Sequence, residues 1–337
     1  MFRLVMDTLS RKSLIDRVIG LVLGKTPTDK EKLNISRLAV LLLLLVVTVD
    51  KRQALDALRR NCPVGFQTQL EKLVGEIVAD NRLDSYLSGT QENERTALML
   101  GYPEWWVEYC IRVWGRGEAL RLLGNRARPR YLHLNPLRST GTPESQLLML
   151  PGLEPATSLP GFFRVLTEGL PGQVREYVEN GILEGQDLAS YLAVKAGSPT
   201  EKDAVLDVCT APGAKTGALS QLMNNTGTIV SADYSRRRIR DWKRMVAMLG
   251  VENASGVVED MTRPALKKES MFDLILVDPP CSGSGIFDKN PEMRWHISPQ
   301  RLARNAELQY RLLQESSKFL NQGGRMVYST CSISVEE

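Results

Sequence analysis

The segment FDLILVDPPCSGSG, residues 272–285, places an acid and a thiol directly after an apolar run. Its first six residues predict a strand buried on both faces, and open α/β sheets bind ligands just beyond the carboxyl ends of such strands. Asp278 and Cys281 lie at that end. The two prolines between them fix φ and forbid a helix, so the backbone leaves the strand extended and directs both side chains toward one pocket. The segment therefore predicts a site that combines a carboxylate with a cysteine.

A second cysteine ends another predicted strand. The segment GRMVYSTC, residues 324–331, finishes on Cys331, so both thiols would stand at the ends of neighbouring strands. From the residues alone, either thiol could be the reactive one. The chain has five cysteines, widely spaced and without a CxxC pair, which argues against a disulfide framework and against structural zinc. We expect no metal, and we expect Cys62 and Cys110 to be packing residues.

These two strands belong to a longer alternating pattern that begins after Pro199. Five segments separated by helical stretches predict strands: 204–209, 227–233, 254–260, 272–278 and 324–331. The pattern is typical of a parallel, doubly wound, Rossmann-like sheet, so the predicted fold class is α/β. Three of these strands end on an acid, namely Asp233, Asp260 and Asp278. Acids at the carboxyl ends of several strands of one sheet indicate a ligand crevice.

The first crossover, DVCTAPGAKTGALS at residues 207–220, stands where a Rossmann fold holds its nucleotide. It lacks GxGxxG, so NAD is a poor fit, but the helix that follows offers free backbone amides at its N-terminus. A ligand with a small carboxylate and an adenosine fits better, which is S-adenosylmethionine. Asp233 is placed to accept hydrogen bonds from the ribose hydroxyls, and Asp260 would lie beside the adenine.

Residues 1–124 carry leucine-rich helical periodicity and predict an all-helical domain. Within it, SRLAVLLLLLVV at residues 36–47 predicts a central, buried helix. A further helix starts at the proline of YPEWWVEYCIRVWG, residues 102–115, in which Trp106 and Cys110 share one face. Tryptophans this close together could stack on bases, but on an apolar helix face they favour a place in the core.

Residues 125–200 predict a small α/β connector domain that opens with a basic stripe around the strand-like YLHLN. The arginines of this stripe are Arg126, Arg128, Arg130 and Arg138. Arginines arranged in this way neutralise phosphates and stack on bases, so they are predicted RNA contacts; the alternative is a solvated linker face. His133, inside the stripe, is given no role.

Composition and charge set outer limits on the function. With 337 residues, 43% of them hydrophobic and 24% charged, the chain is an ordinary globular protein of two or three domains. The net charge of +4 does not by itself identify a nucleic-acid binder. The longest apolar run, residues 38–49, is too short for a membrane span and lacks the features of a signal peptide. We therefore expect a cytoplasmic protein without a membrane partner.

The segments DVCTAPGAKT, SADYSRRR, VDPPCSGSGIFDKNPEMRW and GGRMVYSTCSISVEE, in this order and spacing, resemble the Sun/RsmB family of RNA 5-methylcytosine methyltransferases. The resemblance covers roughly residues 125–337, because NPLR (135–138) and GQDLASYLA (185–193) are also similar to the family's connector. Residues 1–124 are loosely similar to the NusB-like RNA-binding domain of some members. The family usually shows Ala-Ala-Pro-Gly-Gly-Lys where this chain has TAPGAK, so Ala214 replaces a glycine while the Pro-Gly pair and the lysine are kept.

The resemblance implies that residues 201–337 bind S-adenosylmethionine and methylate carbon 5 of cytosine in RNA. Carbon 5 is a weak nucleophile, so a thiolate must first add to carbon 6 and create an enamine that attacks the methyl group. By resemblance Cys331 is this nucleophile, Asp278 is the acid that stabilises the adduct, and Cys281 assists release. Lys215 contacts the base or lowers the thiol pKa. The predicted cofactor contacts are Cys209, Thr210, Ala211, Pro212, Gly213, Ala214, Lys215, Asp233, Arg238, Asp260 and Asp278.

Two other functions are alternatives. One is an amino-group nucleic-acid methyltransferase, since Asp-Pro-Pro followed by an aromatic residue grips an exocyclic amine; here Cys281 stands in place of the aromatic residue. The other is a non-catalytic RNA-binding or assembly factor that keeps the fold. A covalent adduct with RNA that contains 5-fluorocytosine would separate them, because neither alternative needs a bond between enzyme and base. Ribosomal RNA is the expected partner, ahead of transfer RNA.

The chain stops at Glu337, just after the strand that carries Cys331, where family members continue through further strands of the sheet. The last strand would then be an edge with free backbone N–H and C=O groups. We expect a monomer if the chain is complete. If the C-terminal strands are missing, we expect nearly normal cofactor binding, weak activity and association with other chains.

Overall fold

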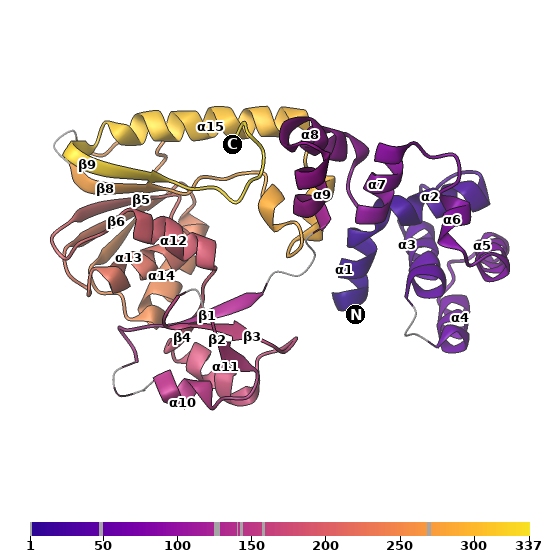
Figure 1. Cartoon of the computed structure of the whole chain (residues 1–337), viewed down its shortest axis with the longest axis horizontal. Helices are drawn as coiled ribbons and strands as arrows, with labels where there is room; N and C mark the ends of the chain where they lie inside the picture. Colours follow the sequence, from indigo (N-terminus) through magenta and orange to yellow (C-terminus); the bar gives the residue numbers. More distant parts are fainter. Residues whose placement is uncertain are drawn as a thin grey trace. The chain divides into compact units, whose positions relative to one another are not determined.

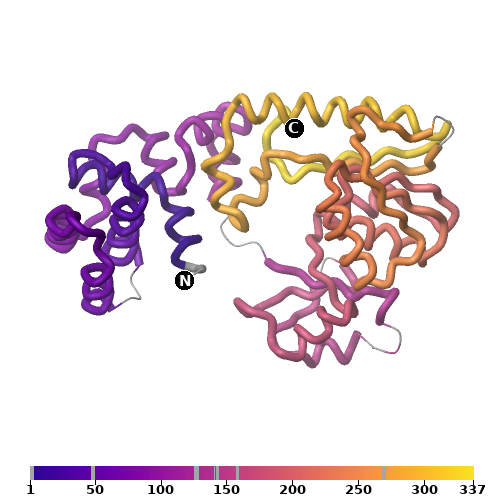
Figure 2. The backbone as a smooth tube through the Cα atoms, turned by 180° about the vertical axis from the view of Figure 1, so that it is seen from behind, coloured from indigo at the N-terminus to yellow at the C-terminus, as the bar shows by residue number. Residues whose placement is uncertain are grey.

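The computed structural model describes residues 2–46, 50–124, 129–139, 141, 144–156, 159–267 and 271–337 (Figures 1 and 2). Its contacts divide the chain into two compact units. The first unit comprises residues 1–127 together with 286–297, and the second comprises 128–285 together with 298–337. The predicted connector thus groups with the predicted methyltransferase domain, and the boundaries at residues 124 and 200 stay predictions.

The first unit is all-helical, as its leucine periodicity predicts. Its helices are α1 (Phe2–Ser10), α2 (Lys12–Leu23), α3 (Lys30–Val40), η1 (Leu41–Leu45), α4 (Lys51–Arg60), α5 (Gln67–Ala79), α6 (Leu83–Tyr86), α7 (Glu92–Leu100), α8 (Glu104–Trp114), α9 (Arg116–Gly124) and η3 (Pro291–Trp295). Apolar side chains of α2, α3 and α5 form one core, among them Ile15, Ile19, Ala39, Leu73 and Ile77.

The predicted helix over residues 36–47 is confirmed as far as Leu45. It begins earlier, at Lys30, where the Asp29 carboxylate accepts a hydrogen bond from the Lys32 N–H at 3.0 Å and caps the helix. Its final turn, Leu41–Leu45, is a π-helix. The buried positions include Val40, Leu41 and Leu43, so the segment is a core helix of this unit.

Helix α8 carries the predicted packing residues Trp106 and Cys110. Both side chains are fully buried, and the Trp106 ring stacks on Tyr109 with the centroids 4.9 Å apart. Burial raises the pKa of the Cys110 thiol to about 12. These side chains are therefore core, and Cys110 is an unreactive thiol at neutral pH.

The segment of residues 286–297 packs into the helical unit, although the sequence analysis counted it with the predicted domain at 201–337. Phe287 is buried against the rings of Tyr102 and Trp106, with centroids 6.2 Å away in each case. The guanidinium of Arg294 donates to the Gly101 carbonyl at 3.2 Å and lies over the Tyr102 ring. Aromatic burial and a nearly buried cation thus hold this segment against the helices.

The second unit begins with a small antiparallel sheet in the order β2-β3-β1-β4. Its strands are β1 (Arg130–Leu134), β2 (Leu153–Pro155), β3 (Phe162–Val165) and β4 (Leu183–Gly185), and its helices are α10 (Glu144–Leu148), α11 (Gly172–Glu179) and α12 (Leu188–Ala196). Leu132, Phe163, Val174 and Leu183 form its core. The predicted strand at YLHLN is confirmed as β1.

The same unit holds a five-stranded parallel sheet in the order β7-β6-β5-β8-β9. Its strands are β5 (Ala204–Val208), β6 (Thr228–Asp233), β7 (Ala254–Val258), β8 (Phe272–Val277) and β9 (Leu320–Tyr328). The doubly wound sheet is therefore confirmed, and β9 is its edge. Helices α13 (Ala214–Leu222) and α14 (Arg236–Leu249) cover one face and α15 (Pro299–Ser317) covers the other (Figures 1 and 2).

Alternation along the central strands explains how both faces are buried. Leu206 and Val277 pack with Leu312 of α15, whereas Val205 and Leu276 pack with the helices on the opposite face. Each strand therefore reads as a continuous apolar run, because its odd and even positions both meet a layer of helices.

The ends of two strands differ from prediction. β9 ends at Tyr328 and not at Cys331, because after Ser329 the backbone leaves β8 and the Cys331 carbonyl accepts from the Gly285 N–H at 2.8 Å. β7 ends at Val258 and not at residue 260, since Asp260 forms a turn by accepting from the Thr262 N–H at 3.0 Å. The thiol of Cys331 and the carboxyl of Asp260 therefore lie on loops beyond the sheet.

Side-chain and glycine caps bound the long helices of this unit. The Ser235 hydroxyl accepts from the Arg238 N–H at the start of α14, and Gly250 ends that helix with φ +75°. Ser298 caps α15 by accepting from the Arg301 N–H at 3.2 Å. The caps fix where α14 and α15 start relative to the carboxyl ends of the strands.

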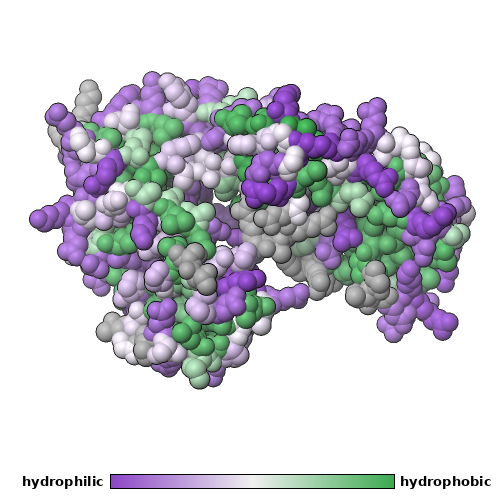
Figure 3. Space-filling model, viewed as in Figure 1, coloured by the Kyte–Doolittle hydropathy of each residue, from purple (hydrophilic) through white to green (hydrophobic). Residues whose placement is uncertain are grey.

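No helix in the described part of the chain is both long and apolar enough to cross a membrane. On the face drawn in Figure 3, hydrophilic residues lie among hydrophobic ones over both units.

Candidate active site

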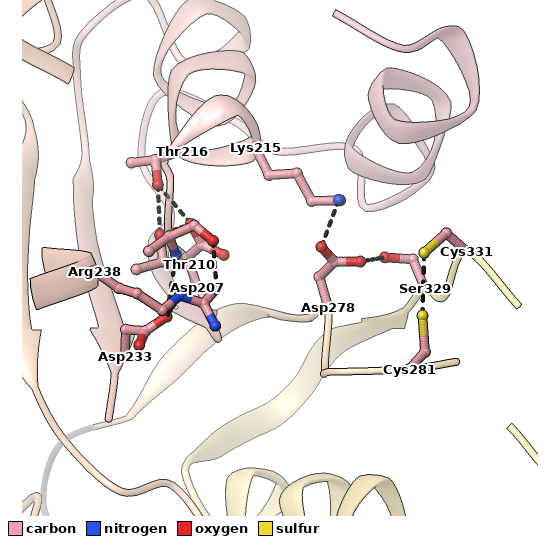
Figure 4. Close-up of polar contacts among 11 residues, drawn as sticks. Asp207, Thr210, Lys215, Thr216, Asp233, Arg238, Asp278, Cys281, Ser329 and Cys331 are labelled. Carbon is pink, nitrogen blue, oxygen red and sulfur yellow. Dashed lines mark hydrogen bonds and ion pairs between the residues drawn. The ribbon is translucent and has the colours of Figure 1, made fainter. Parts of the chain in front are cut away.

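A buried carboxylate organises the first crossover loop. Both the Thr210 and Thr216 hydroxyls donate to Asp207 Oδ2, at 2.5 and 2.6 Å (Figure 4). The Trp242 indole donates to Thr216 Oγ1 at 2.9 Å. Asp207 is fully buried, its Oδ1 has no hydrogen-bond partner among the described residues, and burial raises its pKa to about 6. This role of Asp207 was not predicted from the sequence, although an acid inside a strand buried on both faces is a signal for it.

The loop then turns into α13 through Gly213, whose φ of +118° favours glycine. A Cβ at this position would lie 3.0 Å from the Trp242 ring. A helix leaves its first backbone amides without an intrahelical partner, and amides at the start of α13 can in this way bind a small carboxylate. The predicted Pro212, Gly213 and Ala214 thus shape the loop, and the substitution at Ala214 leaves the helix start intact.

A hollow of about 400 Å³ lies beyond the ends of β5, β6 and β7. It is lined by Cys209, Ala232, Asp233, Tyr234, Glu259, Asp260, Met261, Thr262, Pro280, Leu308 and Leu312. Three predicted cofactor residues, Cys209, Asp233 and Asp260, are therefore brought together. The apolar side of the hollow, with Met261 and Leu308, was missed by the sequence analysis, because it comes from a loop and from α15.

Asp233 is almost completely buried at the end of β6, next to Arg238. The guanidinium Nε of Arg238 lies 3.3 Å from Asp233 Oδ2, and another nitrogen of that side chain donates to the Ala211 carbonyl at 2.5 Å. The Ser235 N–H donates to Asp233 Oδ1 at 3.0 Å. Arg238 therefore orients Asp233 and the crossover loop, and the carboxylate oxygens are acceptors suited to ribose hydroxyls.

Asp260 lies on the far side of the same hollow. Hydrogen bonds from the Thr262 hydroxyl and N–H lower the pKa of its carboxyl, and burial opposes them weakly. The carboxylate is thus ionised and held by its own turn.

The predicted catalytic residues meet beyond the ends of β8 and β9 (Figure 4). Lys215 Nζ lies 2.7 Å from Asp278 Oδ2, and the Ser329 hydroxyl donates to Asp278 Oδ1 at 3.0 Å. The sulfurs of Cys281 and Cys331 lie 3.1 Å apart. The structure therefore brings together a lysine, an acid and two thiols; Ser329 is an addition that the sequence analysis did not name.

The two thiols are within hydrogen-bond distance of each other, and this contact shifts the pKa of both. The hydrogen bond from Cys331 lowers the pKa of Cys281 to about 7 against the effect of burial, and the same contact raises the pKa of Cys331. The pair therefore loses its first proton near neutral pH and its second much less readily. Cys209 differs, because burial raises the pKa of its thiol to about 12.

The predicted RNA contacts are only partly described. Arg126 and Arg128 lie outside the described residues. The Arg130 guanidinium donates to the Thr167 carbonyl, and that of Arg138 donates to the Ala247 carbonyl of α14 at 2.9 Å. Arg138 thus ties the connector to α14, and the RNA role of all four arginines stays a prediction.

The described ranges contain no group of three or more His, Cys, Asp or Glu side chains that could hold a metal ion.

A parallel sheet covered on both faces, with an acid at the end of its second strand and a hollow beyond it, is the arrangement of a Rossmann-like domain that binds a ligand at the carboxyl ends of its strands. Residues 194–337 match the family model described as 16S rRNA methyltransferase RsmB/F. Residues 194–337 are therefore similar to the S-adenosylmethionine-dependent methyltransferase domain of this family. The NusB-like character of residues 1–124 stays a prediction.

Curated relatives share this domain and, in part, the rest of the chain. A probable ribosomal RNA small subunit methyltransferase B of Synechocystis is 26% identical over 351 residues, covering 99% of this chain and 77% of that protein. A probable ribosomal RNA small subunit methyltransferase B of Bacillus subtilis is 35% identical over 158 residues, covering 47% of this chain and 35% of the relative. A 28S rRNA (cytosine-C(5))-methyltransferase of Mus musculus is 33% identical, covering 75% of this chain and only 32% of the relative.

Solved structures show the same architecture. The crystal structure of PH0851 is 26% identical and superposes with a TM-score of 0.81 over 99% of this chain and 77% of that one. A methyltransferase homologue from Pyrococcus horikoshii is 27% identical, with a TM-score of 0.63 over 73% of this chain and 79% of its own.

Proposed function

We propose that the protein methylates carbon 5 of a cytosine in ribosomal RNA through a covalent bond between Cys331 and carbon 6 of the base. The observation that carries this proposal is the contact of two thiols 3.1 Å apart beside the Lys215–Asp278 pair. An amino-group methyltransferase needs an acid but has no use for paired thiols. Bound S-adenosylmethionine supplies the electrophilic methyl group.

The thiol pair provides both the nucleophile and its proton acceptor. The proton of Cys331 passes to the Cys281 thiolate, and the Cys331 thiolate then forms a bond to carbon 6 while the carbon 5–carbon 6 π electrons move toward carbon 5. After methyl transfer a base takes the proton of carbon 5, the double bond forms again, and the bond between sulfur and carbon 6 breaks. Cys281 returns its proton to the leaving sulfur, which is how it assists release.

Asp278, oriented by Lys215, acts on the cytosine ring of the substrate. Asp278 is one-third exposed, and its carboxylate lies between the Lys215 ammonium and the Ser329 hydroxyl. These two contacts hold the carboxylate in one orientation, from which it can accept a hydrogen bond from the exocyclic amine of cytosine, and from the ring nitrogen once that nitrogen is protonated in the adduct. Stabilising the adduct in this way lowers the barrier to attack by the thiolate.

The cofactor fits the hollow that ends β5, β6 and β7. Asp233 would accept from the ribose, Asp260 would lie by the adenine, and the amides that open α13 would bind the carboxylate of the amino acid. The apolar lining from Met261 and Leu308 suits the flat faces of an adenine ring.

RNA as the substrate is supported by the names of the relatives, which act on ribosomal RNA, and by charge on α14. Its exposed cations are Arg236, Arg237, Arg240, Lys243 and Arg244, and all but Arg236 line a hollow of about 540 Å³ together with Asp241. A basic surface of this kind attracts phosphates. This surface would attract the phosphates of any RNA, so the preference for ribosomal RNA over transfer RNA rests on the names of the relatives. We also propose that the protein is a monomer in the cytoplasm.

The test is methyl transfer to transcripts of small-subunit ribosomal RNA and of transfer RNA, read by bisulfite sequencing. The expected result is one protected cytosine in the ribosomal transcript, together with a covalent adduct when the RNA contains 5-fluorocytosine. Methyl transfer without an adduct would support the amino-group alternative, and RNA binding with neither product would support the non-catalytic one.

A further inference from the structure

The Glu337 carboxylate contacts a cluster of serine hydroxyls that follow the two cysteines in the chain, namely those of Ser282, Ser284 and Ser332. We propose that Glu337 is a positioning residue, whose carboxylate holds the loop after β8 and the loop after β9 together so that the two thiols stay in contact. This inference rests on the proposed function for its catalytic consequence, and on contacts of the described residues for its geometry.

Glu337 reaches both cysteine loops through the residue that follows each cysteine. Its Oε1 accepts from the Ser282 N–H at 2.8 Å, and its Oε2 accepts from the Ser332 hydroxyl at 2.7 Å. Ser282 follows Cys281 and Ser332 follows Cys331 in the chain. One carboxylate therefore bridges the two backbone positions that decide the distance between the sulfurs.

The serines also bind one another across the same gap. The Ser332 hydroxyl lies 3.0 Å from those of both Ser282 and Ser284, and Ser284 Oγ accepts from the Ile333 N–H at 2.9 Å. A cluster of hydroxyls needs a final acceptor, and an ionised carboxylate provides one because it accepts and never donates. Hydroxyls that point toward a charge also form stronger hydrogen bonds than neutral pairs do.

The carboxylate is tied to regular elements on its other side. Asn305 of α15 donates to Oε1 at 2.7 Å. The Tyr328 hydroxyl, at the end of β9, donates to Gln309 Oε1 at 2.8 Å, and the Gln309 amide donates to the Pro280 carbonyl at 2.9 Å. These hydrogen bonds connect the loops that carry Cys281 and Cys331, which lie beyond the sheet, to α15 and β9.

Glu337 is ionised where it stands. Burial, which by itself raises the pKa of this carboxyl, is outweighed by the hydrogen bonds from Ser282, Ser332 and Asn305, so the pKa is lowered. Replacement by glutamine keeps the shape but turns an N–H₂ group toward the donors at Ser282 or Ser332. We therefore expect glutamine to disrupt the bridge almost as much as alanine does.

The first readout is steady-state kinetics of the whole chain with an RNA substrate. We expect Glu337→Gln and Glu337→Ala to lower kcat at least tenfold while KM for RNA and Kd for S-adenosylmethionine change less than twofold. Glu337→Asp keeps the charge and should recover part of kcat. Glu307→Gln is the matched control, because this carboxylate on α15 is largely exposed and pairs with Arg311.

The second readout separates positioning from a plain charge effect. The charged or titratable groups near the thiols are Asp278, Lys215, Tyr328 and Glu337. The alkylation midpoint is the pH at which the thiol pair reacts with iodoacetamide at half its maximal rate. Loss of the sulfur contact would move this midpoint upward by about one pH unit, toward that of a free thiol. Loss of the negative charge alone would move the midpoint downward.

The outcomes decide between the two proposals. An upward shift with a fall in kcat supports the inference; an unchanged or downward midpoint, or an unchanged kcat, overturns it. If the parent chain forms no adduct with RNA, the proposed function fails, and the alkylation midpoint alone decides whether Glu337 positions the thiols. Ser332→Ala removes one donor with little threat to folding, and should shift the midpoint in the same direction.

Discussion

At the residue scale, the two cysteines have separable tasks that follow from their contact. We expect Cys331→Ala to abolish both methyl transfer and adduct formation, because it removes the attacking sulfur. Cys281→Ala should form the adduct more slowly, because Cys281 also accepts the proton of Cys331. The adduct should then be long-lived on a denaturing gel, because no proton returns to the leaving sulfur across the 3.1 Å contact. Cys62→Ala, in the helical unit, is the control and should change neither. An adduct with Cys331→Ala but none with Cys281→Ala would reverse the assignment.

A second residue-scale prediction concerns pH and Asp207. Its pKa is raised to about 6 in the folded chain, so above pH 6 the folded state holds a buried charge that costs stability. As pH falls from about 6 toward 4, the folded state takes up the proton before the unfolded state does, and this group's contribution to stability rises. Asp207→Asn should therefore be more stable than the parent at pH 7.5, by up to about 3 kcal/mol for two pKa units, and lose most of that advantage by pH 4.

The measurement for Asp207 is urea unfolding of both chains at several pH values, with calorimetry of S-adenosylmethionine binding as a check that the crossover loop is intact. If the difference in unfolding free energy between parent and variant stays constant from pH 4 to 7.5, the Asp207 carboxyl does not cause the pH dependence of stability.

At the element scale, two basic surfaces are candidates for binding RNA. One is the predicted stripe of Arg126, Arg128 and Arg130; the other is the exposed side of α14. One triple variant replaces the three stripe arginines by alanine, and the other replaces Arg237, Arg240 and Lys243 of α14. Each should weaken RNA binding. Each should also lower the slope of log affinity against log salt concentration by about 0.7 per lost phosphate contact.

The matched control for both triple variants is on α15, which covers the opposite face of the sheet. Arg304→Ala with Arg311→Ala removes exposed charge without touching either surface. Equal slopes for the parent and one triple variant would show that this surface is solvated and makes no phosphate contact.

At the scale of the whole molecule, the chain that follows the Cys281 loop belongs to the helical unit. Phe287 is six residues after Cys281, yet its ring packs with Tyr102 and Trp106. We expect Phe287→Ala to destabilise the helical unit by about 3–5 kcal/mol, as for other buried aromatic side chains, while Kd for S-adenosylmethionine stays unchanged.

Urea unfolding followed by tryptophan fluorescence can measure this, because four of the five tryptophans lie in the first unit: Trp105, Trp106, Trp114 and Trp295. Val64→Ala is the control, since that side chain is exposed. A loss below 1 kcal/mol would mean that the segment of residues 286–297 is not part of the helical core.

Local patterns in the sequence were enough to predict the elements and much of the site. Apolar runs, the caps Ser235 and Ser298, and the acids that end β6 and β8 depend only on neighbouring residues and on the periods of helix and strand. The motifs around Pro212 and Cys281 were specific enough to indicate the methyltransferase family.

Only the tertiary structure decided which of these groups touch. The sulfur contact joins residues 50 positions apart, and the bond from Lys215 to Asp278 spans 63, so both depend on strand order and on loop conformation that no local pattern encodes. The same holds for the unpartnered oxygen of Asp207, for the grouping of Phe287 with the helices and for the bridge at Glu337. Periodicity predicts which side of an element is buried, whereas the partner it meets is set by how the elements pack.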